Sequence, residues 1–218
     1  MRFSSLLIAL GLTGGMVCAA EPAGPDPDSA LRDLLAGNRR FVEGKAQHPH
    51  QSAERRIEVA KDQHPFAIIL GCADSRVAPE ILFDEGDGDL FVVRVAGNVV
   101  SNEVLGSIEY AVQHLGTRLI VVLGHQRCGA VSAAVEGGQP EGHLVSLMDA
   151  IMPAVRETKG TPGDPVENAM RANVVRQAGA VRRDDLISRA SAAVKVVAAR
   201  YDLEAGAVEI LKEPRALQ

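Results

Sequence analysis

The chain has 218 residues, of which 46% are hydrophobic and 23% are charged. This length and composition fit one globular α/β domain with a substantial core, and they leave little room for a second domain. The formal net charge is -5, and no stretch is rich in lysine and arginine. The chain therefore lacks the basic surface that holds phosphate backbones, and no nucleic-acid partner is expected.

The first twenty residues have the pattern of a secretory signal peptide. Arg2 is the only charged residue among them, an apolar run covers residues 6–17, and Ala19 and Ala20 supply the small residues of a cleavage site. The apolar run is shorter than the roughly 20 residues of a membrane-spanning helix. We therefore predict a signal peptide over residues 1–20, and after its removal a periplasmic or secreted protein without a membrane segment.

The rest of the chain alternates between helical and strand patterns. Residues 21–30 form a proline-rich linker, which is followed by a single domain over residues 31–218. The expected elements, in chain order, are an amphipathic helical arm over 31–42, a helix over 52–61, strands over 66–71 and 90–95, a helix over 102–115, a strand over 119–124, helices over 129–135, 144–158 and 166–180, and a hairpin of 194–201 with 207–211. This order predicts a mainly parallel central sheet with flanking helices, an N-terminal helical arm and a C-terminal β-hairpin.

Two short motifs follow the ends of predicted strands, where parallel sheets gather their reactive groups. They are GCADSRV, starting at Gly71, and GHQRCGA, starting at Gly124. Together they contain two thiols, one imidazole and one carboxylate, a set that suits tetrahedral zinc. Each motif alone has a simpler interpretation: a disulfide between Cys72 and Cys128, a packed histidine, or a structural ion pair at a turn. Their joint occurrence favours a metal site.

The two motifs together resemble the signature of the β-class carbonic anhydrases. The likeness runs from about Leu31 to Leu211 and includes the segments GDLFVVRVAGN, SIEYAVQHL and ENAMRANV. It implies that Cys72, His125 and Cys128 bind one Zn²⁺ per subunit and leave a fourth position for water. It also implies the reaction, in which zinc-bound hydroxide attacks carbon dioxide and reversibly yields bicarbonate and a proton.

The resemblance assigns a supporting pair to the same centre. Asp74 would accept a hydrogen bond from the zinc-bound hydroxide, and the guanidinium of Arg76 would hold its carboxylate. In some family members the aspartate instead binds the zinc and displaces the water, which gives a closed, inactive form. The sequence leaves open which of the two arrangements this chain prefers.

The resemblance also implies a pocket shared between subunits of a homodimer or homotetramer. Gln63, Phe91 and Tyr110 would bind substrate from the neighbouring subunit. Independently of the resemblance, backbone amides near Gly129 stand at a predicted helix start and could add donors for an oxyanion. The arm over residues 31–42 would pack across the partner. By periodicity alone, core packing explains Phe91 and Tyr110 equally well, and Gln63 reads as an ordinary loop residue.

Three other functions remain open. A carbonyl sulfide or carbon disulfide hydrolase would share the fold and the zinc ligands, so only an assay separates it from the first hypothesis. An exported thiol redox protein would use the two cysteines, but the Cys-x-x-Cys spacing is missing. A zinc-storing or structural protein would bind the metal with its fourth position closed.

Overall fold

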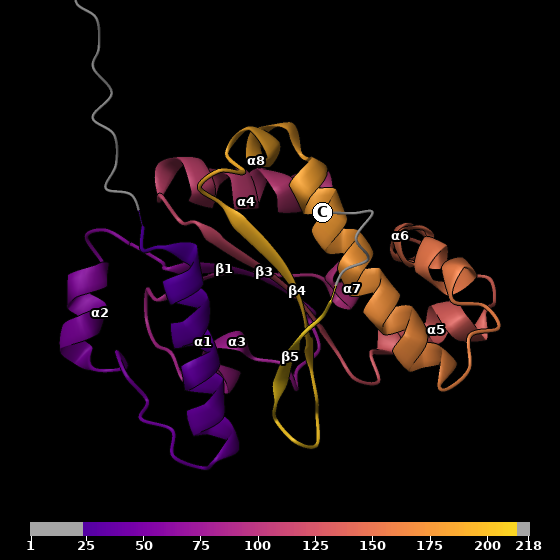
Figure 1. Ribbon diagram of the computed structural model, residues 1–218, viewed down its shortest axis with the longest axis horizontal. Coiled ribbons are helices and arrows are strands. Elements are labelled where there is room, and N and C mark those ends of the chain that lie inside the picture. Colours follow the sequence, from indigo (N-terminus) through magenta and orange to yellow (C-terminus); the bar gives the residue numbers. More distant parts are fainter. Residues whose placement is uncertain (1–23, 213–218) are drawn as a thin grey trace, which may run out of the picture.

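The computed structural model describes residues 24–212, and a five-stranded sheet with the order β2-β1-β3-β4-β5 runs through its middle (Figure 1). The predicted signal peptide lies outside the described residues. The strands are β1 (Ala67–Gly71), β2 (Leu90–Arg94), β3 (Leu119–His125), β4 (Lys195–Tyr201) and β5 (Val208–Ile210). The first four are parallel, and β5 returns antiparallel to β4. The predicted mainly parallel sheet with a C-terminal hairpin is therefore confirmed.

The central strands are apolar because the sheet is covered on both faces. Every residue of β1 and β3 is buried, as expected for inner parallel strands built from near-continuous Val, Ile and Leu. Alternate residues of these strands face the two sides, so Ile68 belongs to one core cluster and Ile69 to the other. The loops that follow β1 and β3 consequently leave the sheet side by side at its carboxyl end.

Two groups of helices cover the sheet (Figure 1). Helices α1 and α3 contribute to the core on one face, and α4 to α8 contribute to the core on the other. Their bounds are α1 (Pro27–Val42), α2 (Ala53–Val59), α3 (Pro79–Leu82), α4 (Asn102–His114), α5 (Gly129–Glu136), α6 (Leu144–Glu157), α7 (Pro165–Arg183) and α8 (Asp185–Arg189). None of the helices within residues 24–212 combines the length and the hydropathy needed to cross a membrane.

Helix α1 begins earlier than the predicted arm. It begins at Pro27 and is capped by the side chain of Asp26, so the last four residues of the predicted linker are helical. Its buried Ala30 and Leu34 pack on the sheet of the same chain, and the packing of residues 31–42 across a partner stays a prediction. Asn38 fixes this position by donating to the carbonyl oxygens of Leu82 and Gly206, at 2.9 and 2.8 Å.

Three short elements had no counterpart in the sequence prediction. They are α3, α8 and the 3-10 turn η1 (Ala96–Asn98). Each spans at most five residues, which is too short for a helical period to show in the hydrophobic pattern. The turn η1 matters for function because it lies against the carboxyl end of β1, where the candidate site begins.

Candidate metal centre

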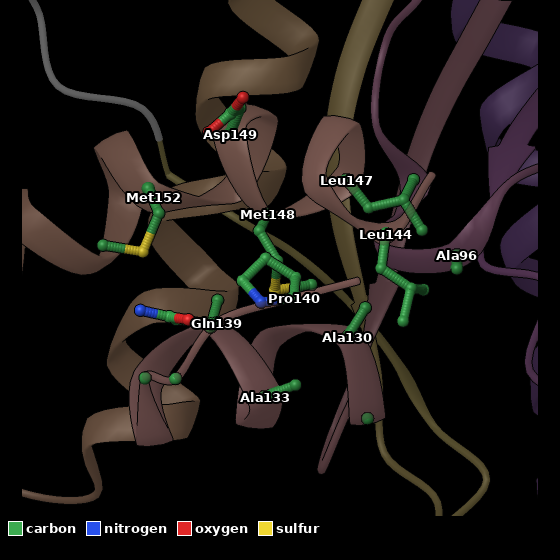
Figure 2. A pocket seen from close by; sticks show the side chains of 14 residues that line it. Ala96, Ala130, Ala133, Gln139, Pro140, Leu144, Leu147, Met148, Asp149 and Met152 are labelled. Carbon is green, nitrogen blue, oxygen red and sulfur yellow. The ribbon is translucent and has the colours of Figure 1, made fainter. Parts of the chain in front are cut away.

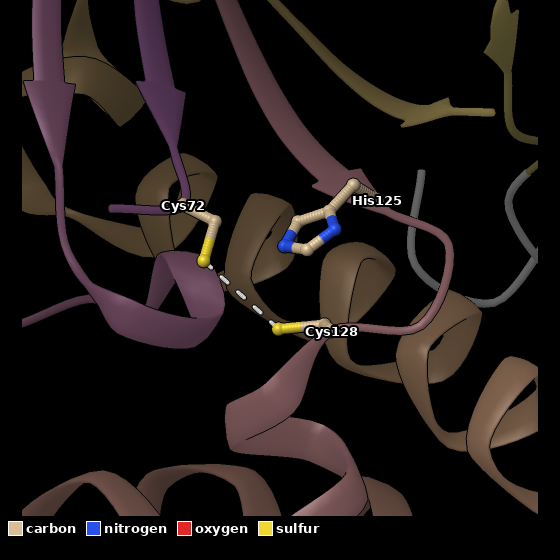
Figure 3. A group of neighbouring side chains, drawn as sticks. All are labelled: Cys72, His125 and Cys128. Atoms are coloured by element: carbon tan, nitrogen blue, oxygen red, sulfur yellow. Dashed lines mark hydrogen bonds between the residues drawn. The ribbon is translucent and has the colours of Figure 1, made fainter. Parts of the chain in front are cut away.

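Three buried side chains converge at the carboxyl end of the sheet (Figure 3). Cys72 follows β1 directly, His125 is the last residue of β3, and Cys128 immediately precedes α5. Because β1 and β3 are adjacent and parallel, their ends bring together residues more than fifty positions apart. The ligand atoms all lie within 4.8 Å of one another, and the two sulfurs are 4.0 Å apart.

Gly124 permits this arrangement because α7 passes directly over the end of β3. A Cβ at Gly124 would lie 2.2 Å from Cγ2 of Val174, well inside contact distance. Any larger residue would push α7 away from the strand end and expose the imidazole of His125, which is fully buried here. The glycine of the GHQRCGA motif is thus a packing requirement of the site.

The donor set fits a zinc ion. Nδ1 of His125 donates to the carbonyl oxygen of Gln126 at 3.0 Å, which leaves the lone pair on Nε2. This Nε2 is buried and has no hydrogen-bond partner among the described residues. The two cysteines are free thiols, so they form no disulfide in this structure. Two sulfurs and an imidazole nitrogen oriented by a backbone carbonyl are a donor set that could hold a metal ion, and their types are those that suit zinc.

The electrostatics of the thiol pair favour a cation. The sulfurs of Cys72 and Cys128 share a hydrogen bond, and this interaction lowers the pKa of Cys72. The same interaction raises the pKa of Cys128, because a second negative charge beside the first is unfavourable in a buried place. A divalent cation between the sulfurs removes this repulsion, so metal binding and loss of the second proton go together.

The Asp74–Arg76 pair lies beside the three ligands. Arg76 grips both carboxylate oxygens of Asp74, at 2.9 and 2.7 Å, and these hydrogen bonds hold the pKa of Asp74 well below its usual range. Oδ2 of Asp74 lies 3.7 Å from Nε2 of His125. Asp74 is therefore ionised and close to the centre, but its oxygens are held by Arg76 and are not part of the three-residue cluster.

Arg94 supports the same loop and was missed by the sequence reasoning. It stands at the end of β2, next to β1, and its Nε donates to the carbonyl oxygen of Cys72 at 2.9 Å. Its Nη2 donates to the carbonyl oxygen of Asp74 at 2.6 Å. The only signal in the sequence is a charged residue that closes the apolar strand LFVVR.

An apolar cavity of about 680 Å³ opens between α5 and α6 (Figure 2). Gly129, which follows Cys128, lines one part of it, and a Cβ added at Gly129 would meet nothing within 4 Å. The predicted binding residue Gly129 therefore borders open, mostly apolar space. The other lining residues are Ala96, Ala130, Ala133, Ala134, Gly137, Gly138, Gln139, Pro140, Leu144, Leu147, Met148, Asp149 and Met152.

The remaining predicted residues gather at the opposite end of the strands. Phe91 is paired in register with Ile68, four residues before Cys72, which corresponds to about 13 Å along the strand. The ring centroids of Phe91 and Tyr110 lie 6.3 Å apart, and Gln63 lines a shallow depression together with Tyr110. Within one chain, the structure brings these three residues together, but away from the metal ligands.

Comparison with known proteins agrees with this architecture. The carbonic anhydrase family model matches residues 67–208. Carbonic anhydrase 2 of Mycobacterium tuberculosis is 52% identical over 134 residues, which are 60% of this chain and 65% of that protein, so the match spans slightly less than two thirds of that relative. The carbonic anhydrase of Pseudomonas aeruginosa is 31% identical over 200 residues, covering 83% of this chain and 87% of that protein.

Solved structures share the whole fold. A tetrameric β-carbonic anhydrase of Sordaria macrospora superposes with a TM-score of 0.70 at 25% identity, covering 85% of this chain and 98% of that one. The Coccomyxa β-carbonic anhydrase in complex with acetazolamide gives a TM-score of 0.65 at 29% identity, covering 84% and 87%. This chain belongs to the β-class of the carbonic anhydrase family.

Proposed function

We propose that the protein binds one zinc ion per subunit and catalyses the reversible hydration of carbon dioxide to bicarbonate. The observation that carries this proposal is the buried cluster of Cys72, His125 and Cys128, whose two sulfurs and imidazole Nε2 lie close enough together to bind one cation. Zinc held there would act as a Lewis acid and make a nucleophilic oxygen available near neutral pH. The side chains around the cluster would orient the attacking water and bind the substrate.

Asp74 is the group that orients the attacking water. Its Oδ2, ionised and fixed by the fork of Arg76, can accept a hydrogen bond from a water molecule beside Nε2 of His125. A hydrogen bond accepted there turns a lone pair of the water oxygen toward the substrate. The apolar wall next to Gly129 suits carbon dioxide, a small molecule without charge, better than it suits bicarbonate.

We further propose a homodimer or homotetramer in which Gln63, Phe91 and Tyr110 complete the metal centre of a neighbouring subunit. Their position at the other end of the strands supports this proposal, as does the side chain of Tyr110, which remains 47% exposed in the single chain. The Sordaria relative is described as tetrameric. Export to the periplasm or the medium, directed by residues 1–20, is likewise a proposal.

The deciding experiment is stopped-flow carbon dioxide hydration on the purified protein at about pH 7 to 9, with zinc counted on the same sample. We expect about one zinc per subunit and a hydration rate that rises with pH. One zinc per subunit without hydration at any pH would reject the activity, and carbonyl sulfide and carbon disulfide would then be tested on the same sample. Absence of zinc with two reactive thiols would reject the metal centre itself.

A further inference from the structure

The turn η1 places a backbone donor against one of the metal ligands. The N–H of Gly97 donates to Sγ of Cys72 at 3.3 Å. Gly97 and Asn98 both have left-handed backbone angles, with φ of 70° and 45°, a conformation that few residues other than glycine and asparagine adopt readily. The turn therefore depends on its surroundings to keep the Gly97 N–H aimed at the sulfur.

Two amides of α7 supply that support. Nδ2 of Asn173 donates to the carbonyl oxygen of Gly97 at 2.9 Å, and Oδ1 of Asn173 accepts from Nε2 of Gln177 at 3.0 Å. Oε1 of Gln177 in turn accepts from the N–H of Val100 at 2.9 Å, just past the turn. Asn173 and Gln177 are one helical turn apart on the same side of α7, and both are buried.

These contacts form a chain that leads from α7 to the proposed metal ligand Cys72. Gln177 orients Asn173, Asn173 holds the Gly97 carbonyl, and the next step is the Gly97 N–H on Cys72. A buried amide pair is stable only if its donors and acceptors are hydrogen-bonded, so loss of one partner leaves the other group unpaired and destabilises the turn. The opposite side of the turn is also confined, since a Cβ on Gly97 would lie 2.8 Å from Cδ1 of Ile151.

We propose that Asn173 is a positioning residue for the metal centre, and that Gln177 supports it. By holding the turn, Asn173 keeps the Gly97 N–H on the Cys72 sulfur, where it withdraws electron density from the thiolate and fixes its direction. Hydrogen bonds of this kind tune metal affinity and the electron-donating strength of the ligand. This inference rests on the proposed function only in requiring a metal at the three-residue cluster.

The test replaces zinc with Co²⁺ in the full chain and records the thiolate-to-cobalt charge-transfer band of the wild type and of Asn173→Leu. Leucine has the same number and branching of side-chain heavy atoms, although its methyl groups are bulkier, and it leaves the Gly97 carbonyl unpaired. A thiolate that loses its donor is easier to oxidise, so we expect the band to move to longer wavelength. We also expect zinc binding, measured by chelator competition, to weaken about tenfold.

The matched control is Asn38→Leu. Asn38 is also buried, and it makes three hydrogen bonds, to Leu82, Gly206 and Val208, on the other face of the sheet. This variant should lower the melting temperature and leave both the cobalt band and the zinc affinity as in the wild type. An equal change of the band in Asn38→Leu would overturn the proposal, as would an unchanged band in Asn173→Leu.

If Asn173→Leu does not fold, Gln177→Leu takes its place, with a smaller shift of the band in the same direction. No shift in Gln177→Leu would then reject the inference. Failure of the proposed function is recognised separately, because a wild type with the cobalt band and no hydration activity rejects only the activity. A wild type without a thiolate-to-cobalt band rejects the metal centre and the role of Asn173 together.

Discussion

The two ends of the parallel strands differ in how completely one chain builds them. At the carboxyl end, Cys72, His125 and Cys128 form a buried ligand set whose supporting contacts all come from the same chain. At the amino end, Phe91 and Tyr110 form an aromatic cluster, yet Tyr110 remains 47% exposed. The residues at the carboxyl end could therefore hold a metal ion within one chain, whereas we propose that those at the amino end act together with a neighbouring subunit.

The largest effect is expected from a substitution that prevents metal binding. His125→Ala takes away the one nitrogen ligand, so we expect loss of bound zinc and a hydration rate at the uncatalysed background. The fold should remain, because the strands that carry the ligands are held by apolar packing. Zinc counting, circular dichroism and stopped-flow hydration check this. His143→Ala removes an exposed imidazole and should leave all three readouts unchanged; zinc retained in His125→Ala would contradict the site.

The next largest effect is expected at Asp74, where a substitution should reduce catalysis without affecting metal binding. Asp74→Asn keeps the shape of the side chain but loses the charge that Arg76 holds, so hydration should fall about 10- to 100-fold with zinc content unchanged. Asp185→Asn, at an exposed acid on α8, is the matched control and should retain full activity. Full activity in Asp74→Asn would show that no carboxylate is needed beside the ligands.

Mixing two variants tests whether Gln63 at the amino end acts in the metal centre of a neighbouring subunit. Gln63→Ala and Cys128→Ala should each reduce hydration at least about tenfold, the first by loss of a substrate contact and the second by loss of zinc. If Gln63 serves the neighbouring subunit, co-refolded mixtures of the two variants contain dimers with one intact centre. Equal amounts should restore about a quarter of the wild-type activity. Absence of any gain would place Gln63 in its own subunit's site or outside the site.

A smaller effect tests the apolar cavity. Ala133→Phe fills part of the space between α5 and α6 without touching a metal ligand. We expect kcat/KM for hydration to fall about fivefold, equivalent to about 1 kcal/mol, with zinc content unchanged. Ala133→Ser keeps the volume and should behave as wild type. Equal rates for the two variants would mean that substrate does not use this cavity.

The smallest effect concerns stability at the amino end. Burial, together with the charge of Asp89, raises the pKa of Glu85 to about 7. The folded state then binds the proton more tightly than the unfolded chain, so this contribution is complete below about pH 4.5 and is lost as the pH rises through 7. Relative to the wild type, Glu85→Gln should become more stable as the pH rises from about 5 to 8, by at most about 1 kcal/mol in the free energy of unfolding because the side chain is partly exposed. Melting temperatures recorded at both pH values check this. If the variant and the wild type differed in melting temperature by the same amount at the lower and the higher pH, the raised pKa of Glu85 would be refuted.

Local patterns were enough for most of the fold. The runs FAIILG and LIVVLG predicted buried parallel strands because only such strands lack a polar face, and β1 and β3 follow them closely. The short α3, α8 and η1 escaped prediction because a hydrophobic period needs more residues than they contain. Helix α1 was predicted as a helix from its apolar stripe, but the stripe does not say which chain it packs against.

The sequence by itself determined the ligand types and their places at strand ends, since the residues of CADSR and GHQRC follow apolar strands of fixed direction. Only the tertiary structure shows which atoms face one another. It places the two sulfurs 4.0 Å apart, leaves Nε2 of His125 without a hydrogen-bond partner among the described residues, and brings Arg94 within hydrogen-bond distance of the Cys72 carbonyl oxygen. Contacts of this kind join residues far apart in the chain. They depend on strand register and on close helix approach, which no local pattern of residues encodes.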